Sequence, residues 1–208
     1  MRENFKITGL FYQKAGYNFR KFLNIIRNDT NRKIPDLMVV MMNPGSSRPF
    51  DGNENSFIET EAIPDKTQDQ IMKIMNECGF DFARILNLSD LREAKSSVFY
   101  KKIEELNTKK ISHSIFDMER NDDFQDLFVQ NVPVIFAWGV NKYLFKLAKM
   151  AIERVGSVNP IGLRKNSFEF AYYHPLPRFK NEREEWVDKI IKIFKENHNQ
   201  IDNSANNI

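Results

Sequence analysis

The chain has 208 residues, of which 41% are hydrophobic and 28% are charged, and these values favour one globular domain with a buried core over two domains. No apolar run is long enough to span a bilayer, and the first residues lack the apolar core of a secretory signal. Cys78 is the only cysteine, which excludes an internal disulfide and favours a cytoplasmic location. The three histidines lie far apart in the sequence, so we expect no metal site and no cofactor.

Positive charge is concentrated at the start of the chain. Residues 1–33 carry eight Lys or Arg and two Asp or Glu, a net charge of +6, whereas the whole chain carries +3. This basic N-terminal element also contains the aromatic residues Phe5, Phe11, Tyr12, Tyr17, Phe19 and Phe22. Cations that neutralise phosphates and rings that stack on bases can together bind nucleic acid. The simpler interpretation is that the rings belong to the core and the cations form a solvated face.

Four short apolar runs predict buried strands, because continuous apolar character is typical of strands covered on both faces. The runs are residues 36–42, 82–88, 133–138 and 168–173. Helical periodicity between them indicates crossover helices, so we expect a three-layer α/β/α fold with a four-stranded, mainly parallel sheet. This domain is expected to occupy residues 1–196, and the Asn-rich residues 197–208 are expected to form a disordered polar tail.

Three of the expected helices have recognisable ends. Thr67 is a candidate N-cap for a helix that Gly79 would end. An apolar stripe that begins at Val140 predicts a second helix ending at Gly156. Apolar residues that follow Trp186 at helical spacing predict a C-terminal helix.

Each predicted strand ends in polar, Gly or Pro-containing sequence. The segments are M-N-P-G at 42–45, I-L-N-L at 85–88, F-A-W-G at 136–139 and H-P-L-P at 174–177. Ligands of open parallel sheets bind outside the carboxyl ends of the strands, so these segments predict a ligand site. Structural alternatives exist for each segment: a simple turn at Asn43, a cap at Asn87, and core positions for Trp138 and His174.

The four segments, in this order, resemble the strand ends of the uracil-DNA glycosylase superfamily. The resemblance covers about residues 36–180 and implies the four-stranded parallel sheet of that superfamily. The chain departs from the superfamily pattern at Met41, where Gly is usual, at Asn43, where the most active branch has Asp, and at Leu176, where Ser is usual. The chain is still more similar to an uncharacterised bacterial family that carries N-P-S/G, W-G and H-P-L, for which the resemblance implies a fold and a site but no assigned reaction.

The residues at these strand ends suit cleavage of a base from its sugar. His174 can donate a hydrogen bond to the base oxygen on which negative charge develops. Asn43 can orient the attacking water or contact the sugar, although an amide is not a strong base. Asn87 can pair with a base edge, and Phe50 can stack on the base. Gly45 allows the chain to turn close to the ligand.

A phosphate is expected beside the same site. Arg48, Lys66 or Thr67 would meet it, because arginine grips phosphate bidentately and helix N-termini bind anions. The expected catalytic residues are therefore Asn43 and His174. The expected substrate-binding residues are Pro44, Gly45, Arg48, Phe50, Lys66, Thr67, Asn87 and Gly139.

The sequence thus predicts a uracil-DNA-glycosylase-like protein that hydrolyses the N-glycosidic bond of a modified or damaged base in DNA. Two alternatives remain open: a non-catalytic nucleotide or nucleic-acid binder, and a hydrolase of a free nucleoside or nucleotide. DNA or a nucleotide is the expected partner, without metal and without membrane. A P-loop enzyme, a serine hydrolase and a zinc deaminase are disfavoured, because G-x-x-x-x-G-K-S/T, G-x-S-x-G and P-C-x-x-C are all absent.

Overall fold

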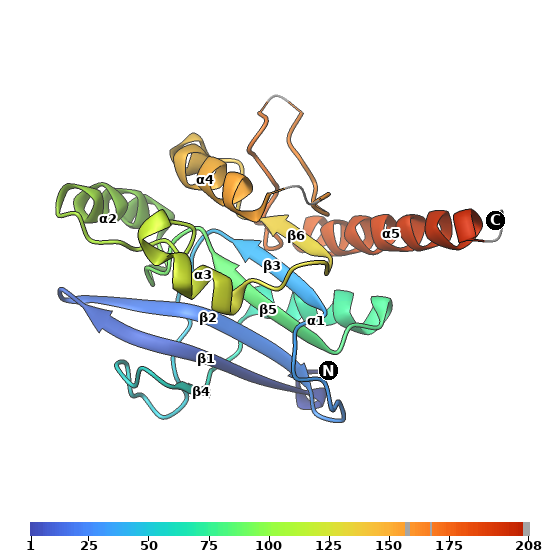
Figure 1. Cartoon of the computed structure of the whole chain (residues 1–208), viewed down its shortest axis with the longest axis horizontal. Coiled ribbons are helices and arrows are strands. Elements are labelled where there is room, and N and C mark those ends of the chain that lie inside the picture. Colours follow the sequence, from blue (N-terminus) through green and yellow to red (C-terminus); the bar gives the residue numbers. More distant parts are fainter. Residues whose placement is uncertain (157–158, 167, 206–208) are drawn as a thin grey trace.

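The computed structural model describes residues 1–156, 159–166 and 168–205, with side chains as far as Asn197. Its centre is a six-stranded mixed sheet in the order β4-β1-β2-β5-β3-β6 (Figure 1). The strands are β1 (Phe5–Lys14), β2 (Tyr17–Arg27), β3 (Leu37–Met41), β4 (Glu59–Glu61), β5 (Phe82–Asn87) and β6 (Val134–Ala137). The helices are α1 (Lys66–Cys78), α2 (Ser96–Thr108), α3 (Asn121–Leu127), α4 (Phe145–Val155) and α5 (Lys180–Ala205), with 3-10 turns η1 (Arg2–Asn4), η2 (Met118–Arg120) and η3 (Lys142–Leu144).

The expectation of a four-stranded, mainly parallel sheet is wrong. β3 pairs in parallel with β5 and β6, as expected, but β2, β1 and β4 extend the sheet beyond β5 as antiparallel strands. Continuous apolar runs identified the three strands that helices bury on both faces. β1 and β2 mix buried and exposed positions along their length, so neither produces such a run.

The basic N-terminal element is a long β-hairpin formed by β1 and β2. Its two-residue turn, Ala15-Gly16, has positive φ angles of 50° and 80°, which are the signs that a type I′ turn requires. The rings of Phe11 and Phe19 are completely buried, and Tyr12 is nearly so. These aromatic residues therefore belong to the core, which agrees with the simpler interpretation of this element.

The fourth predicted strand is also absent. Residues 168–173, all of them described, make only isolated bridges, from Tyr172 to Gly139 and to Arg164. Phe168 is 40% exposed, so the segment is not buried like the other runs. It packs beyond the end of β6 instead, where the indole Nε1 of Trp138 donates to the carbonyl oxygen of Phe170 at 2.8 Å, while Ile161 pairs with the free edge of β6. Trp138 is fully buried, as its structural alternative required.

The structure confirms the predicted C-terminal ends of two helices but not their starts, and α4 begins at Phe145 rather than near Val140. α1 ends at Gly79, whose φ of 75° is left-handed, and α4 ends at Gly156. The N-cap of α1 is Asp65 rather than Thr67, and its capping box includes Gln68. α5 continues to Ala205, through most of the segment predicted as a disordered tail, and residues 206–208 lie outside the described residues.

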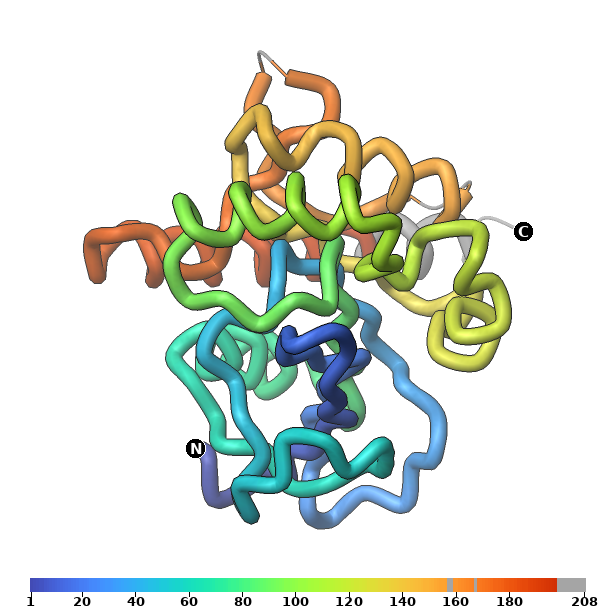
Figure 2. Tube along the Cα trace, turned by 90° about the vertical axis from the view of Figure 1, so that its left-hand side faces the viewer, coloured from blue at the N-terminus to red at the C-terminus, as the bar shows by residue number. Residues whose placement is uncertain are grey.

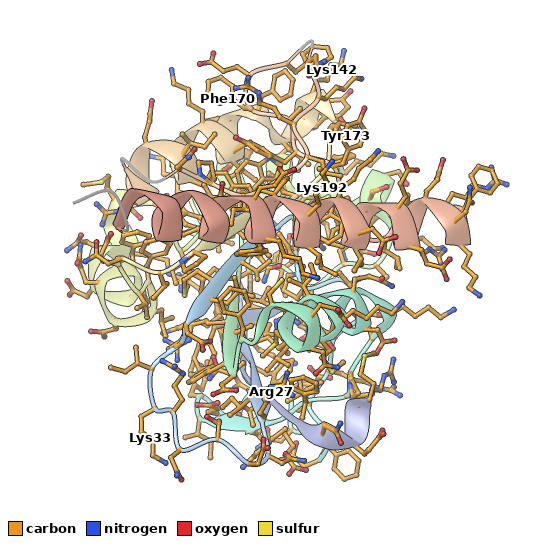
Figure 3. The ribbon with its side chains drawn as sticks, turned by 90° about the vertical axis from the view of Figure 1, so that its right-hand side faces the viewer. Arg27, Lys33, Lys142, Phe170, Tyr173 and Lys192 are labelled. Atoms are coloured by element: carbon orange, nitrogen blue, oxygen red, sulfur yellow. The ribbon has the colours of Figure 1, made fainter. Side chains whose placement is uncertain are left out.

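Two hydrophobic clusters place helices on both faces of the sheet. One cluster packs the sheet against α2, α3 and α4, and the other packs it against α1 and α5. Figure 3 shows α5 lying across the molecule beside α1 on the second face. With helices on both sides, the interior of β3 is fully apolar, so polar side chains gather where the strands end.

A buried ion pair ties the hairpin to the segment that carries α3. Asp90 is fully buried, and its Oδ2 accepts from the Tyr12 hydroxyl at 3.0 Å and from Arg120 Nη1. Burial alone would lower the pKa of Arg120. The interactions with Asp90 and Asp123 have the larger effect, so the pKa of the guanidinium is raised. Lys21 of β2 extends the network by donating to Asp123 at 2.7 Å.

Breaking this pair should cost more stability than breaking a surface pair. Arg120→Met leaves the Asp90 carboxylate buried without its cation, and we expect the free energy of unfolding to fall by about 3 kcal/mol in urea denaturation. Adding Asp90→Asn should recover part of the loss. Lys192→Met, which removes an exposed partner of Glu196, serves as control and should change nothing measurable. An Arg120→Met loss no larger than that of the control would contradict the assignment.

Candidate functional site at the carboxyl edge of the sheet

Three parallel strands end at the same level of the sheet. Met41, the last residue of β3, is in register with Asn87 of β5 on one side and with Ala137 of β6 on the other. β2 runs antiparallel to β5, so the start of β2 lies at this same edge, where Arg20 N donates to the carbonyl of Asp90 at 2.9 Å. Figure 2 looks onto this edge, with the β1–β2 hairpin near the centre and α2 crossing above it. We call it the carboxyl edge.

Asn87 and Arg20 form the buried centre of the carboxyl edge. Asn87 is fully buried, and its side-chain amide satisfies both of its ends in only one orientation, in which Nδ2 donates to the carbonyl of Asn43 at 3.2 Å and Oδ1 accepts from Arg20 Nη2 at 3.1 Å. Arg20 is 3% exposed, and burial lowers its pKa to about 10, partly offset by the negative charges of Asp65 and Asp90. The amide expected to read a base edge therefore holds a guanidinium instead.

Asn43 connects two loops of the carboxyl edge. Its Nδ2 donates to the carbonyl oxygens of Glu93 at 2.7 Å and of Leu91 at 3.3 Å, which fastens the loop after β3 to the loop after β5. The next residues form the turn that the structural alternative describes, with Pro44 buried and Gly45 at a φ of 61°. Only the Oδ1 of this amide can still face a ligand, so the nitrogen has a positioning role.

One ring nitrogen of His174, Nε2, makes no hydrogen bond to another described residue. Its Nδ1 accepts the backbone N–H of Leu176 at 3.1 Å, which places the ring proton of the neutral imidazole on Nε2. Burial lowers the pKa of His174 to about 4, although the charge of Asp65 acts in the opposite direction. At neutral pH this ring is therefore an uncharged hydrogen-bond donor, the form required to stabilise an oxyanion without itself losing a proton.

Asp65 is the carboxylate of the carboxyl edge. Its Oδ1 accepts the backbone N–H groups of Thr67 at 2.8 Å and of Gln68 at 3.1 Å as the N-cap of α1. Its negative charge partly offsets the lowering of the pKa values of Arg20 and His174 that burial causes. Asp65 therefore lies within electrostatic reach of both side chains. Among the described residues, Oδ2 accepts no hydrogen bond and remains available to a ligand or a water.

The structure gives little support to a phosphate at the start of α1. The Thr67 N–H donates to Asp65, so a carboxylate already occupies the position expected for the anion. Arg48 and Lys66 are exposed. Phe50 is 71% exposed on the loop between β3 and β4. None of these side chains contacts Asn87 or Arg20 in the hydrogen bonds and ion pairs of the described residues.

Gly139 lies directly beyond the end of β6. Its N–H donates to the carbonyl of Tyr172 at 2.7 Å, and its φ of 107° is one that side-chain-bearing residues rarely adopt. This close pairing holds the segment that leads to His174 against the end of β6. Gly139 therefore acts on the site through the backbone, by placing the histidine.

Half of the eight Lys and Arg residues of the basic N-terminal element form ion pairs. The ion pairs join Arg2 to Asp69, Lys21 to Asp123, Arg27 to Asp81 and Arg32 to Asp36. Paired cations neutralise phosphates less well than free ones, because the partner carboxylate repels the same anion. A nucleic-acid surface over this hairpin is therefore less favoured than the sequence suggested.

Sequence reasoning missed three residues at or beside the carboxyl edge: Arg20, Asp65 as a site carboxylate, and Ser47. Ser47 is 2% exposed, and its Oγ has no hydrogen-bond partner among the described residues. Arg92 pairs with Glu54, yet its buried Nε has no partner either. Asp65 carried a signal as a helix-start residue before a crossover helix. Arg20 carried none, because its position depends on the pairing of β2 with β5.

The fold and the edge define an α/β protein with a polar cluster at the carboxyl ends of three parallel strands. Residues 24–176 match the family described as "Protein of unknown function (DUF1643)", and the chain belongs to that family. This membership agrees with the resemblance to a family without an assigned reaction. No relationship to the uracil-DNA glycosylase superfamily emerges from the comparisons, since neither a curated protein nor a solved structure matches the chain.

Two absences concern the described residues alone. None of their helices combines the length and the apolar character needed to cross a membrane. Within the same residues, no three His, Cys, Asp or Glu side chains gather in a way that could hold a metal ion.

The buried histidines should make stability fall in mild acid. Burial lowers the pKa values of His174 and His113 to about 4, from an ordinary value of 6.5, so the unfolded chain binds these protons first. The free energy of unfolding should be level above pH 6.5 and should fall as the pH drops from about 6.5 to about 4. Urea denaturation at a series of pH values measures it. His174→Asn should make this decline shallower, and an unchanged slope would show that His174 titrates normally.

Proposed function

We propose that the carboxyl edge binds a nucleoside or nucleotide unit and hydrolyses its N-glycosidic bond. The observation that carries this proposal is the neutral His174, whose Nδ1 is fixed by Leu176 so that Nε2–H is the free donor. A donor of this kind can stabilise the negative charge that develops on the departing base. The unit is either a modified or damaged base in DNA or a free nucleoside or nucleotide.

The proposed reaction is a hydrolysis that balances without a further reactant. The bond between C1′ of the sugar and the base nitrogen breaks, and its electron pair leaves with the base. His174 Nε2–H donates to the carbonyl oxygen of the departing base. Water forms the new bond to C1′ and loses a proton, and the base anion gains one. Asp65 Oδ2 is the group best suited to orient that water and to stabilise the positive charge on the sugar.

This assignment redistributes the roles that the sequence suggested. Asn43 and Asn87 support the proposal as positioning residues, because their amide nitrogens are committed to protein carbonyl groups. Asp65, a carboxylate, is a better partner for the water than the amide of Asn43, since an amide accepts no proton near neutral pH. The cleavage chemistry therefore depends on His174 and Asp65.

A non-catalytic nucleotide-binding function is the second candidate. It is favoured by the same commitment of the two amides, because neither amide nitrogen is then free to take part in a reaction. The ion pairs of Lys21 and Arg27 leave the hairpin with fewer free cations for a DNA backbone, which favours a free nucleotide as the bound molecule.

Base release tests the proposed function. The full chain is incubated with oligonucleotides that carry uracil, hypoxanthine or methylated bases, followed by alkali, and separately with nucleosides and nucleoside monophosphates. We expect release of a free base, and we expect His174→Ala to lower the rate by about 100- to 1,000-fold, the usual effect of removing one oxyanion donor. Asp65→Asn should also lower it while keeping the cap of α1, because Asn is a good N-cap.

A neighbouring variant provides the control. Tyr173→Phe keeps the ring and the backbone carbonyl that accepts from Trp186, and it should leave the rate unchanged. Binding without base release from every substrate would replace the hydrolase by the non-catalytic binder. Release that His174→Ala leaves intact, in a folded protein, would remove the histidine from the reaction.

A further inference from the structure

Arg20 is a buried cation without a partner anion. A guanidinium has five N–H donors, and among the described residues Arg20 fills one of them, from Nη2 to Asn87. Its Nε is buried and has no hydrogen-bond partner, and Arg20 forms no ion pair with any described carboxylate. An unpaired buried charge is destabilising, so a position that keeps one is a candidate for ligand binding.

The surrounding charges do not remove this imbalance. Asp65 acts on Arg20 through its charge, but among the described residues the two side chains form neither a hydrogen bond nor an ion pair. Asp90 also acts on it, but Oδ2 of that carboxylate is already held by Arg120 and Tyr12. Arg92 adds positive charge near Arg20, although Glu54 pairs with it. The carboxyl edge therefore retains an excess of cationic N–H donors at its buried centre.

Further unfilled polar groups lie on the loops that border this centre. Arg92 follows the end of β5 by five residues, and its Nε is buried without a partner. Ser47, in the loop after β3, has a buried hydroxyl without a partner. Guanidinium N–H groups and a hydroxyl are the donors that phosphate oxygens accept from.

We propose that Arg20 binds the terminal phosphate of a nucleoside monophosphate, which makes a free nucleotide the substrate class of the carboxyl edge. The inference rests on the proposed function for the nucleoside part, whereas the phosphate part rests on Arg20 alone. Arginine offers a planar pair of N–H groups that matches two oxygens of a phosphate. A phosphate there would supply the anion that the protein itself does not place beside Arg20.

Burial of Arg20 selects a terminal phosphate over a DNA backbone. The guanidinium is on a side chain only 3% exposed, so the anion must enter the protein to meet it. The phosphodiesters of a DNA strand are flanked by sugars on both sides and carry one charge each. A monoester has one covalent neighbour and close to two negative charges at neutral pH, so it can be inserted and gains more from a buried cation.

Binding measurements with matched arginine variants test the proposal. Inorganic phosphate, ribonucleoside monophosphates, the corresponding nucleosides and a single-stranded oligonucleotide are titrated into the full chain, with affinity measured by calorimetry and Tm by thermal unfolding. We expect monophosphates to bind more tightly than nucleosides and inorganic phosphate to raise Tm. Arg20→Met should weaken monophosphate binding by about 10- to 100-fold, since hydrogen bonds to charged groups have this value. Its own Tm should stay level or rise, because the unpaired charge is gone.

Arg27→Met is the matched control, from the opposite end of the same strand. Arg27 donates to the carbonyl oxygens of Phe80 and Met75 and pairs with Asp81, so its loss should lower Tm and leave phosphate affinity unchanged. Figure 3 labels it on the side of the molecule that carries α1 and α5.

The outcomes separate the two proposals. The phosphate assignment is overturned if the chain binds neither phosphate nor any monophosphate. It is equally overturned if Arg20→Met binds phosphate and the monophosphates as tightly as the unchanged chain does. Phosphate binding that depends on Arg20, with no base release from any substrate, supports the assignment and rejects the hydrolase instead.

Discussion

The parallel pairing of β3 with both of its neighbours is the constraint on which the rest of the site depends. Met41 lies level with Asn87 and Ala137, so three loops leave the sheet at one height. Because helices cover both faces, a polar side chain can be accommodated beside these strands only at their ends. The antiparallel pairing of β2 with β5 then adds the start of β2 to the same place, and Arg20 becomes the buried partner of Asn87.

The sequence predicted the elements whose signals are local. The apolar runs at 36–42, 82–88 and 133–138 became β3, β5 and β6, and Gly79 ended α1 as its left-handed φ allows. The hairpin was missed because its strands alternate buried and exposed residues irregularly, and its turn, Ala15-Gly16, carries a weaker signal than Asn-Gly. The run at 168–173 failed as a strand because apolar composition alone does not distinguish a strand from a loop that covers a sheet edge.

The same distinction between local and distant signals explains what was predictable in the site. The sequence placed Asn87 and Asn43 at strand ends, and both lie at the carboxyl edge. Their roles could not be deduced, because an amide at a strand end can face a ligand or a neighbouring loop with the same sequence. Arg20 lies 67 residues before Asn87 in the chain, and only the register of β2 with β5 brings them together. No sequence pattern within either strand specifies that register.

The two buried charges near the junction of β2 and β5, Arg20 and Asp90, differ in their ion pairing. The backbone N–H of Arg20 donates to the carbonyl of Asp90, so the two residues are neighbours across the junction. Yet the Asp90 carboxylate takes its cation from Arg120, on a separate segment, rather than from Arg20. If the only requirement were stability, the direct pair would satisfy both charges and make Arg120 unnecessary. Within the part of the chain that the structure describes, the fold neutralises Asp90 from elsewhere and leaves Arg20 without an ion pair, so one cation stays available and its N–H donors lie at the edge where the three parallel strands end.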